Sequence, residues 1–486
     1  MFSFTLKAMS NVALFIFRGK GLRREEGAEF AKRGDYGKFL NSRNTGLLLD
    51  GVSLKLSEKE SFQNVCVIAK VGAGKTSRYI IPNVLHRAKS KASMVINDPK
   101  GEVYEATSGY LASKGYEIVL INPEQPDHSH GFNPLAECQN EVEMEQIAEI
   151  LLKCGSSNAS GKDEFWVNGA IRFVSLFIKC LANAGREDPN VNNLANLYFL
   201  FQSFGEDGGA LDNWIAKYSI NPDDIDDETL WQEWKGVLVG NKEGVQSFVL
   251  NAITALKALS NRNIAQLTAR SDFDMQAMRK KRTAIFFVTP PQHAEYYSFL
   301  TSVFFRSVFN ACMREMPNKH TLPVYVFMDE FAHMTLPSFT STANTIRGYK
   351  VSLSIVLQTI SQLDARYGKE YAKAIQGGFG THLTYASADP ETAKFFETII
   401  GRKRITQLPD YVAKNHNEQY REENLINSAE VRMIGEDQTL IVSANRNPVL
   451  TRATPYFRQR GLRKLTDYPM YQIKKKITST LKFISL

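Results

Sequence analysis

The chain has 486 residues, which is too many for one simple hydrophobic core, so two domains are expected. Hydrophobic residues make up 43% of the chain and charged residues 23%, as in a folded globular protein, and the net charge of +8 is compatible with nucleic acid or an anionic membrane as a partner. The five cysteines are scattered singly without a CxxC pair, which argues against structural zinc and disulfides and favours a reducing compartment.

Residues 1–44 form a basic N-terminal segment. Its apolar run, residues 12–17, is far shorter than the ~20 apolar residues of a bilayer-spanning helix, so we expect no transmembrane helix of adequate length. Basic residues flank this run, and two interpretations stay open. Residues 1–24 either lie on an anionic membrane surface or form a helix that packs on the protein body.

A glycine-rich loop is the most informative motif. Residues 65–69 predict a buried strand, the loop 70–74 follows, and a helix opens at Lys75. Such a loop turns backbone N–H groups onto the phosphates of ATP, while the lysine reaches the terminal phosphates and the next hydroxyl ligates Mg²⁺. Ala69 stands where GxxxxGK[ST] has its first glycine, which weakens the match without removing it. The expected nucleotide-binding residues are Gly72, Ala73, Gly74, Lys75, Thr76 and Ser77, with Thr76 as a magnesium ligand.

Two further strands are predicted at residues 94–97 and 117–121, with a helix up to Lys114 between them, and this alternation is typical of a parallel α/β sheet. The turn Asp98-Pro99-Lys100-Gly101-Glu102 follows the first of these strands. It would bring Asp98, Lys100 and Glu102 near the phosphates, although an ordinary turn into a helix has the same composition.

Residues 141–278 show almost no strand-like run and predict an inserted all-α domain. The acidic stretch 221–228 indicates an exposed connection within it. Amphipathic patterns place its helices at residues 143–153, 164–184, 191–204, 230–235 and 244–259.

The α/β pattern resumes after the insertion, so the nucleotide-binding domain is expected to be discontinuous, over residues 45–140 and 279–465, with a mostly parallel sheet. A polar surface excursion is expected at residues 407–434 and a basic C-terminal tail at 466–486. The remaining predicted elements are strands at 283–289, 324–328, 353–357, 382–385 and 439–443 and a long helix at 295–316.

Two carboxylates, Asp329 and Glu330, end the strand predicted at residues 324–328. In P-loop ATPases such a pair completes the site, because the first carboxylate holds the Mg²⁺ shell and the second orients and deprotonates the attacking water. Gln358 ends the following strand, where it could bond both that water and the γ-phosphate, or be only a polar residue at a strand edge. Arg347 precedes that strand and is either an arginine finger acting on a neighbouring subunit or a surface charge.

Several runs together resemble the coupling proteins of type IV secretion and bacterial conjugation, the TraG/TraD family. The resemblance covers most of the chain, from Thr45 to Ser443. It rests on the run 98–102 with Tyr110, on Asn133-Pro134-Leu135, on Phe165-Trp166, on Phe331-Ala332 and on Gln358-Thr359-Ile360-Ser361-Gln362-Leu363 with Tyr367-Gly368.

The resemblance implies a RecA-like motor domain, an all-α domain that engages DNA or protein, and a homo-hexameric ring. The implied partners are DNA bound largely without sequence preference, relaxase or effector proteins, and the ATPases and inner-membrane components of a secretion channel. Family members usually carry an N-terminal transmembrane region, so the short run at residues 12–17 implies a cytoplasmic protein held peripherally at the inner membrane.

Two alternatives remain open at this point. A chromosome-segregation or repair translocase of the FtsK/HerA kind would share the motor but not the run 98–102. A non-hydrolysing secretion-substrate adaptor would carry a decayed P-loop, against which the intact Lys75, Thr76, Asp329 and Glu330 argue strongly.

Overall fold

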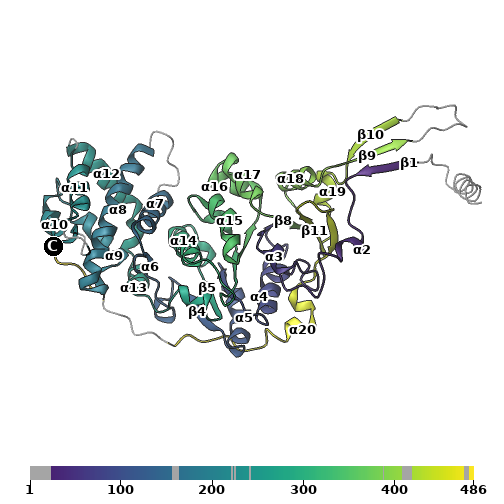
Figure 1. Cartoon of the computed structure of the whole chain (residues 1–486), viewed down its shortest axis with the longest axis horizontal. Helices are drawn as coiled ribbons and strands as arrows, with labels where there is room; N and C mark the ends of the chain where they lie inside the picture. Colours follow the sequence, from purple (N-terminus) through teal and green to yellow (C-terminus); the bar gives the residue numbers. More distant parts are fainter. Residues whose placement is uncertain are drawn as a thin grey trace, which may run out of the picture.

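The computed structural model describes residues 23–155, 164–220, 223, 226–239, 242–386, 388–407, 419–474 and 481–486. Residues 1–24, for which a membrane-surface segment and a helix packed on the body were both left open, therefore lie almost wholly outside the described residues. Seen in Figure 1, helices without strands form one end of the molecule, a sheet flanked by helices forms the middle, and a small three-stranded sheet projects from the other end.

The middle of the molecule is a nine-stranded sheet with the order β12-β11-β8-β2-β7-β6-β3-β5-β4. Neighbours from β8 to β4 are parallel, whereas β11 pairs antiparallel with both β8 and β12. The strands are β2 (Val65–Ile68), β3 (Ser93–Asn97), β4 (Glu117–Ile121), β5 (Thr283–Phe287), β6 (Val324–Met328), β7 (Val351–Leu357), β8 (Thr381–Tyr385), β11 (Gln438–Ser443) and β12 (Val449–Arg452).

Both faces of the parallel part of this sheet are buried, which explains why most of its strands are continuous apolar runs, whereas the edge strand β12 is partly exposed. Successive residues of β2 alternate between two cores, because Val65 and Val67 belong to one and Cys66 and Ile68 to the other. On the first face lie α4 (Ile81–Arg87) and α5 (Glu102–Ser113). On the second lie α14 (Ser298–Met313), α15 (Phe339–Thr345), α16 (Ile360–Tyr367), α17 (Lys369–Gly377) and α18 (Pro390–Ile400).

The chain between β4 and β5 is helical and forms what we call the all-α region, α6 to α13. Trp234 is fully buried at its centre, among the rings of Phe173, Phe177 and Phe204. Three of its helices, α6, α10 and α13, have no counterpart among the predicted ones because each is only one or two turns long. The helices are α6 (Pro134–Glu137), α7 (Glu141–Gly155), α8 (Glu164–Glu187), α9 (Leu194–Gln202), α10 (Asp212–Tyr218), α11 (Thr229–Val237), α12 (Lys242–Ala255) and α13 (Arg262–Thr268).

Helix α8 extends three residues beyond its predicted end at residue 184. Among the described residues it is the one helix that could cross a membrane by length and composition, with a mean hydropathy of 1.4 over its best window. Of that window, 56% is buried inside the molecule, where α8 packs on α7 and α12. Its apolar residues are thus accounted for by the core of the all-α region.

The projecting sheet contains strands in segments where few were expected. Strand β1 (Arg23–Gly27), within the basic N-terminal segment, pairs with β9 (Arg402–Gln407), and β9 pairs with β10 (Gln419–Asn424) inside the polar excursion. These strands are rich in Arg and Glu and lack an apolar alternation, so pattern reading has no signal for them. Four helices of four or five residues complete the fold: α2 (Arg33–Tyr36), α3 (Glu58–Ser61), α19 (Ser428–Arg432) and α20 (Arg460–Arg463).

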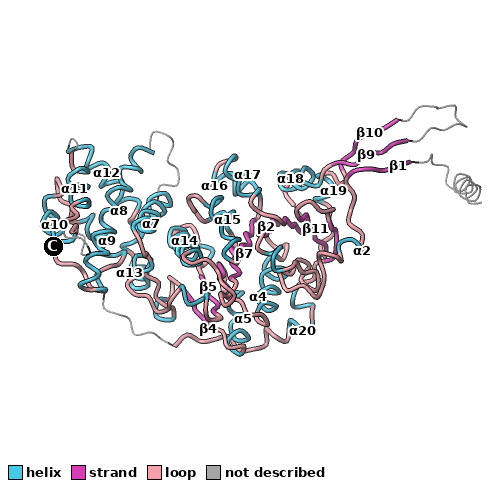
Figure 2. The backbone as a smooth tube through the Cα atoms, in the orientation of Figure 1, coloured by secondary structure: helices cyan, strands magenta, loops and turns pink. Residues whose placement is uncertain are grey.

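The described parts of the expected basic tail pack against the protein. After α20 the chain runs along α5, and its last residues, 481–486, lie on the all-α region (Figure 2). Of the lysines that made this segment basic, Lys475 and Lys476 fall outside the described residues.

Candidate nucleotide-binding site

The glycine loop follows β2 and leads into a helix, as its sequence predicts. Gly72 and Gly74 have φ values of 82° and 81°, a conformation that residues with a side chain rarely adopt. A Cβ atom on Gly72 would meet nothing within 4 Å, so at that position the backbone conformation, and not a lack of space, requires glycine. The first helical turn, Thr76–Ile80, is a π-turn that continues into α4.

Ala69 fits the loop because it still belongs to the sheet. Its backbone N–H donates to the carbonyl of Leu357 at 3.0 Å, which extends the pairing of β2 with β7 by one residue. Its side chain is buried in the core on the α4 and α5 face. The missing first glycine therefore lies in a strand-like position where a methyl group packs well.

Lys75 is held at the base of the loop. Its side chain is only 8% exposed, and Nζ donates a hydrogen bond to the carbonyl of Ala69 at 2.8 Å. Burial lowers the pKa of Lys75, while the carboxylates of Glu330 and Asp329 act in the opposite direction. The lysine and both carboxylates thus share one electrostatic environment.

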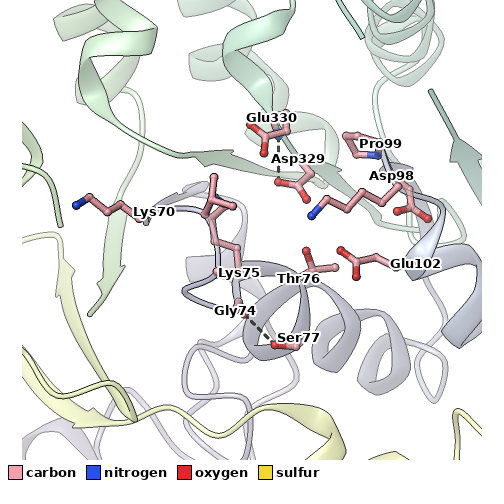
Figure 3. Close-up of a pocket in the computed structure, with 13 residues that line it drawn as sticks. Lys70, Gly74, Lys75, Thr76, Ser77, Asp98, Pro99, Glu102, Asp329 and Glu330 are labelled. Atoms are coloured by element: carbon pink, nitrogen blue, oxygen red, sulfur yellow. Dashed lines mark hydrogen bonds between the residues drawn. The ribbon is translucent and has the colours of Figure 1, made fainter. Parts of the chain in front are cut away.

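The two carboxylates lie where β6 ends, on the edge of the sheet that carries the glycine loop (Figure 3). The Asn97 amide donates to the Asp329 carbonyl at 2.6 Å, and the Glu330 N–H donates to Asp329 Oδ1 at 3.0 Å. Burial and, to a smaller extent, the nearby Glu330 raise the pKa of Asp329 to about 7, although the charge of Lys75 opposes the rise. Glu330 has a φ of 51°, a strained conformation for a residue with a side chain, and such strain is frequent at functional sites.

The turn 98–102 brings a third and a fourth carboxylate to the pocket. Asp98 is 2% exposed and accepts the N–H of Tyr104 at 2.7 Å, and burial raises its pKa to about 7. Glu102 is the first residue of α5, and Figure 3 shows its carboxylate pointing toward the Thr76 hydroxyl. The prediction that this turn reaches the crevice at the strand ends agrees with the geometry.

One pocket collects most of the predicted residues. It is lined by Lys70, Val71, Gly72, Gly74, Lys75, Thr76, Ser77, Asp98, Pro99, Lys100, Glu102, Asp329 and Glu330. Ala73 is absent from this lining, and its carbonyl instead accepts a hydrogen bond from Arg78 Nη1 at 3.0 Å.

Gln358 and Arg347 lie outside the pocket lining. Gln358 Nε2 is 2.8 Å from both carboxylate oxygens of Glu330, so its observed contact is with the proposed base. Arg347 is exposed just before β7. Since β7 runs parallel to β2, Arg347 lies at the end of the strands opposite to the glycine loop of its own chain. It therefore cannot reach the phosphates bound by the same chain.

The sequence assigned no role to two residues that hold the site in place, Arg78 and Asn97. Asn97 precedes the conspicuous turn 98–102 and could have been found, because an amide at a strand end faces the same crevice. Arg78 carries no such signal, since its role of holding the loop carbonyl of Ala73 depends on the π-turn.

The pocket suits a nucleotide bound as its complex with Mg²⁺. The Thr76 hydroxyl and the Asp329 carboxylate are the hard oxygen ligands that Mg²⁺ prefers. In the part of the chain that the structure describes, no group of three His, Cys, Asp or Glu residues could hold a metal alone. Phosphate oxygens and water would therefore complete the coordination of a bound Mg²⁺.

Comparison with known proteins places the chain in a family. The sequence model of the family described as "Type IV secretory system Conjugative DNA transfer" matches residues 32–482. The chain is 25% identical to the protein VirD4 of Rhizobium radiobacter over 422 residues, which cover 83% of this chain and 58% of that protein. It is also 25% identical to VirD4 of Agrobacterium fabrum (strain C58 / ATCC 33970) over 419 residues, covering 82% and 60%. The chain thus spans less than two thirds of the length of these curated relatives.

Solved structures agree on the fold. The bacterial conjugative coupling protein TrwB, in an unbound form, superposes with a TM-score of 0.70 at 16% identity, over 89% of this chain and 94% of that one. TrwB in complex with ADP and Mg²⁺ superposes with a TM-score of 0.68 at 15% identity, and the match covers 96% of this chain and 98% of that one. VirB4 of Thermoanaerobacter pseudethanolicus superposes with a TM-score of 0.51 at 14% identity, and the match covers 87% of this chain and 100% of that one.

Proposed function

Because this chain belongs to the type IV secretory system conjugative DNA transfer family, we propose that it is an ATP-driven coupling protein. It recruits DNA–protein substrates and drives them to a type IV secretion channel. A single structural observation supports the motor activity: the glycine loop, Lys75, Asp329 and Glu330 line one pocket at neighbouring ends of parallel strands. The family match favours this function over a chromosome-segregation or repair translocase.

The residues divide the work of ATP hydrolysis as follows. The loop N–H groups and Lys75 hold the phosphates. Thr76 and Asp329 would hold a Mg²⁺ bound with the nucleotide, and this ion would neutralise negative charge on the phosphates. Glu330 accepts the proton of the attacking water, and Gln358 orients the Glu330 carboxylate through its two contacts of 2.8 Å.

The working unit we propose is a homo-hexameric ring. ATP binds between subunits, and Arg347 reaches the nucleotide of the neighbour, which fits its position at the edge of the sheet opposite to its own pocket. The inserted all-α domain, predicted at residues 141–278 and containing most of the all-α region, engages the DNA or the relaxase or effector protein. The ring lies at the cytoplasmic face of the inner membrane, beside the channel ATPases.

The test is ATPase activity measured with and without single- and double-stranded DNA. We expect activity that DNA stimulates, little dependence on DNA sequence, and DNA affinity that falls steeply with salt as counterions are released. Lys75→Ala should abolish nucleotide binding, whereas Lys70→Ala, which changes an exposed lysine on the same pocket wall, should leave binding nearly unchanged.

The outcomes separate the alternatives. Nucleotide binding without any turnover would indicate a non-hydrolysing adaptor. DNA binding that is insensitive to salt or selects one duplex sequence would contradict translocation along the phosphate backbone.

A further inference from the structure

The C-terminal end of the chain joins two parts of the molecule that are far apart in sequence. We call the described residues 468–474 and 481–486 the C-terminal strap. In Figure 1 the yellow chain passes below α5, and its last residues lie at the all-α region. The first part of the strap therefore contacts α5 of the nucleotide-binding domain, and the second part contacts α9 of the all-α region.

Helix α5 is shaped to receive the first part of the strap. The Tyr471 N–H donates to Ser108 Oγ at 3.0 Å, and the ring of Tyr468 lies 5.4 Å from that of Tyr110. A Cβ atom on Gly109 would lie 1.9 Å from the carbonyl oxygen of Pro469. Only glycine at this helical position lets the strap lie so close to the helix.

The all-α region holds the second part through a buried amide. Asn196 on α9 is fully buried; its Nδ2 donates to the Lys482 carbonyl at 3.0 Å, and its Oδ1 accepts the Ile484 N–H at 3.2 Å. Ile484 is 8% exposed and belongs to the main core. Lys482 also forms an ion pair with Asp188. These contacts dock one short segment at a defined register.

A single residue connects the strap to the nucleotide pocket. The backbone N–H of Tyr104 donates to Asp98 Oδ2 at 2.7 Å, and the hydroxyl of the same Tyr104 donates to the Tyr471 carbonyl at 2.6 Å. Asp98 lines the nucleotide pocket and stands in the turn that begins α5. A shift of that turn must move either Tyr104 or its hydrogen bond to the strap.

We propose that the C-terminal strap couples the nucleotide pocket to the all-α region, so that occupation of the pocket alters how firmly the strap holds α9. This inference rests on the nucleotide site of the proposed function but not on the transported substrate. Coupling of this kind is reciprocal, so loosening the strap changes nucleotide affinity by the same factor by which nucleotide changes strap docking.

The test uses hydrogen exchange of the full chain with and without ADP and Mg²⁺. In the wild type, nucleotide should change hydrogen exchange in α9. Ile484→Asp places a charge in the core. It should raise hydrogen exchange in α9 and abolish the change in exchange that nucleotide causes in the wild type. Leu486→Asp is the matched control, because it adds the same charge two residues later at a side chain that is 50% exposed, and it should behave like the wild type.

A second variant addresses the other end of the connection. Tyr104→Phe removes the hydroxyl that bonds to the strap but keeps the ring and the N–H that Asp98 accepts. We expect it to fold normally, to weaken the exchange response, and to shift the affinity for a fluorescent ADP by about fivefold or more, as Ile484→Asp does.

The results separate this inference from the function on which it rests. If the wild type binds no nucleotide, the proposed function fails. If it binds nucleotide, but the exchange response is absent from the wild type, or is undiminished in Ile484→Asp or in Tyr104→Phe, the strap does not couple the two parts and only this inference is overturned.

Discussion

At the residue scale, the pair formed by Glu330 and Gln358 allows binding and hydrolysis to be separated. Glu330→Gln keeps the shape of the side chain and removes the base, so ATP should stay bound while turnover falls by at least ~10²-fold. A fluorescent ATP analogue measures the binding and phosphate release measures the turnover. Turnover at the wild-type rate would remove Glu330 from its assigned role.

Gln358→Ala provides the matching control at the orienting residue. If Gln358 acts through Glu330, as its contacts indicate, this variant should lower turnover less than Glu330→Gln and leave binding unchanged. An equal loss in the two variants would mean that Gln358 contacts the reacting groups itself.

Asp98 predicts a pH dependence of stability in the nucleotide-free protein. Its pKa of about 7, against an ordinary value of 3.8, means that the folded state binds the proton more tightly than the unfolded state. Stability is therefore lost as pH rises from about 4 to about 7, and the loss is complete above that range. Asp98→Asn, which can still accept the Tyr104 N–H, should raise the melting temperature relative to wild type by a few degrees at pH 8 and hardly at all at pH 4.5.

Thermal melts of both proteins across this pH range provide the measurement. An equal difference at every pH would show that the Asp98 carboxyl does not titrate differently in the folded state.

The nucleotide site is the part that the sequence predicts best at this scale. Lys75, Thr76, Asp329 and Glu330 stand next to glycine turns or strand ends, so their positions follow from local pattern and sheet geometry. The contact of Gln358 with Glu330 could not be predicted, because it depends on the unusual backbone conformation of Glu330.

At the scale of elements, two helical glycines of the all-α region differ in how much space surrounds them. A Cβ atom on Gly169 of α8 would lie 2.2 Å from the Phe248 ring on α12, whereas one on Gly236 of α11 would meet nothing within 4 Å. Alanine favours a helix over glycine by about 1 kcal/mol at both positions. Gly236→Ala should therefore stabilise the all-α region slightly, while Gly169→Ala should destabilise it by about 1–3 kcal/mol through overpacking.

Hydrogen exchange in α8 and α12 is the suitable measurement, because it reports the stability of this helix pair separately from the rest of the chain. The comparison of two helical glycines in one region removes the contribution of helix propensity. Equal stabilisation by the two alanines would show that the α8–α12 contact has room for a methyl group.

Strands of the large sheet are predictable to the extent that they are buried on both faces. Strands β4 and β6 have the predicted bounds, whereas β1, β9, β10 and β12 were not expected. The unexpected strands lie at the edge of the large sheet or in the projecting sheet. Charged residues such as Arg404 and Glu422 are common in the projecting sheet, so its strands show no alternation of apolar and polar residues. Backbone pairing between distant segments decides their structure.

At the scale of the whole molecule, the position of Arg347 predicts complementation between subunits. Arg347→Ala and Lys75→Ala subunits should each be inactive alone, and mixing them should restore part of the ATPase activity. Mixed rings regain interfaces that combine an intact loop with an intact neighbouring arginine. Since loss of such a finger costs ~10³-fold or more in related systems, partial rescue should be clear.

The mixing experiment needs protein that is oligomeric, as judged by its mass in solution. If Arg347→Ala is fully active in that state, another arginine is the finger and Arg347 is a surface charge.

The order of strands in the large sheet also has a consequence for synthesis of the chain on the ribosome. Strand β2, which carries the glycine loop, ends at Ile68, but its two neighbours begin only at Val351 and Thr381. At about 5–20 residues per second, β2 waits roughly 15–60 s for its partners, whereas α7 to α13 meet most of theirs within their own stretch of chain. The all-α region can therefore fold first, and the apolar β2 strand is the part of the nascent chain most in need of a chaperone.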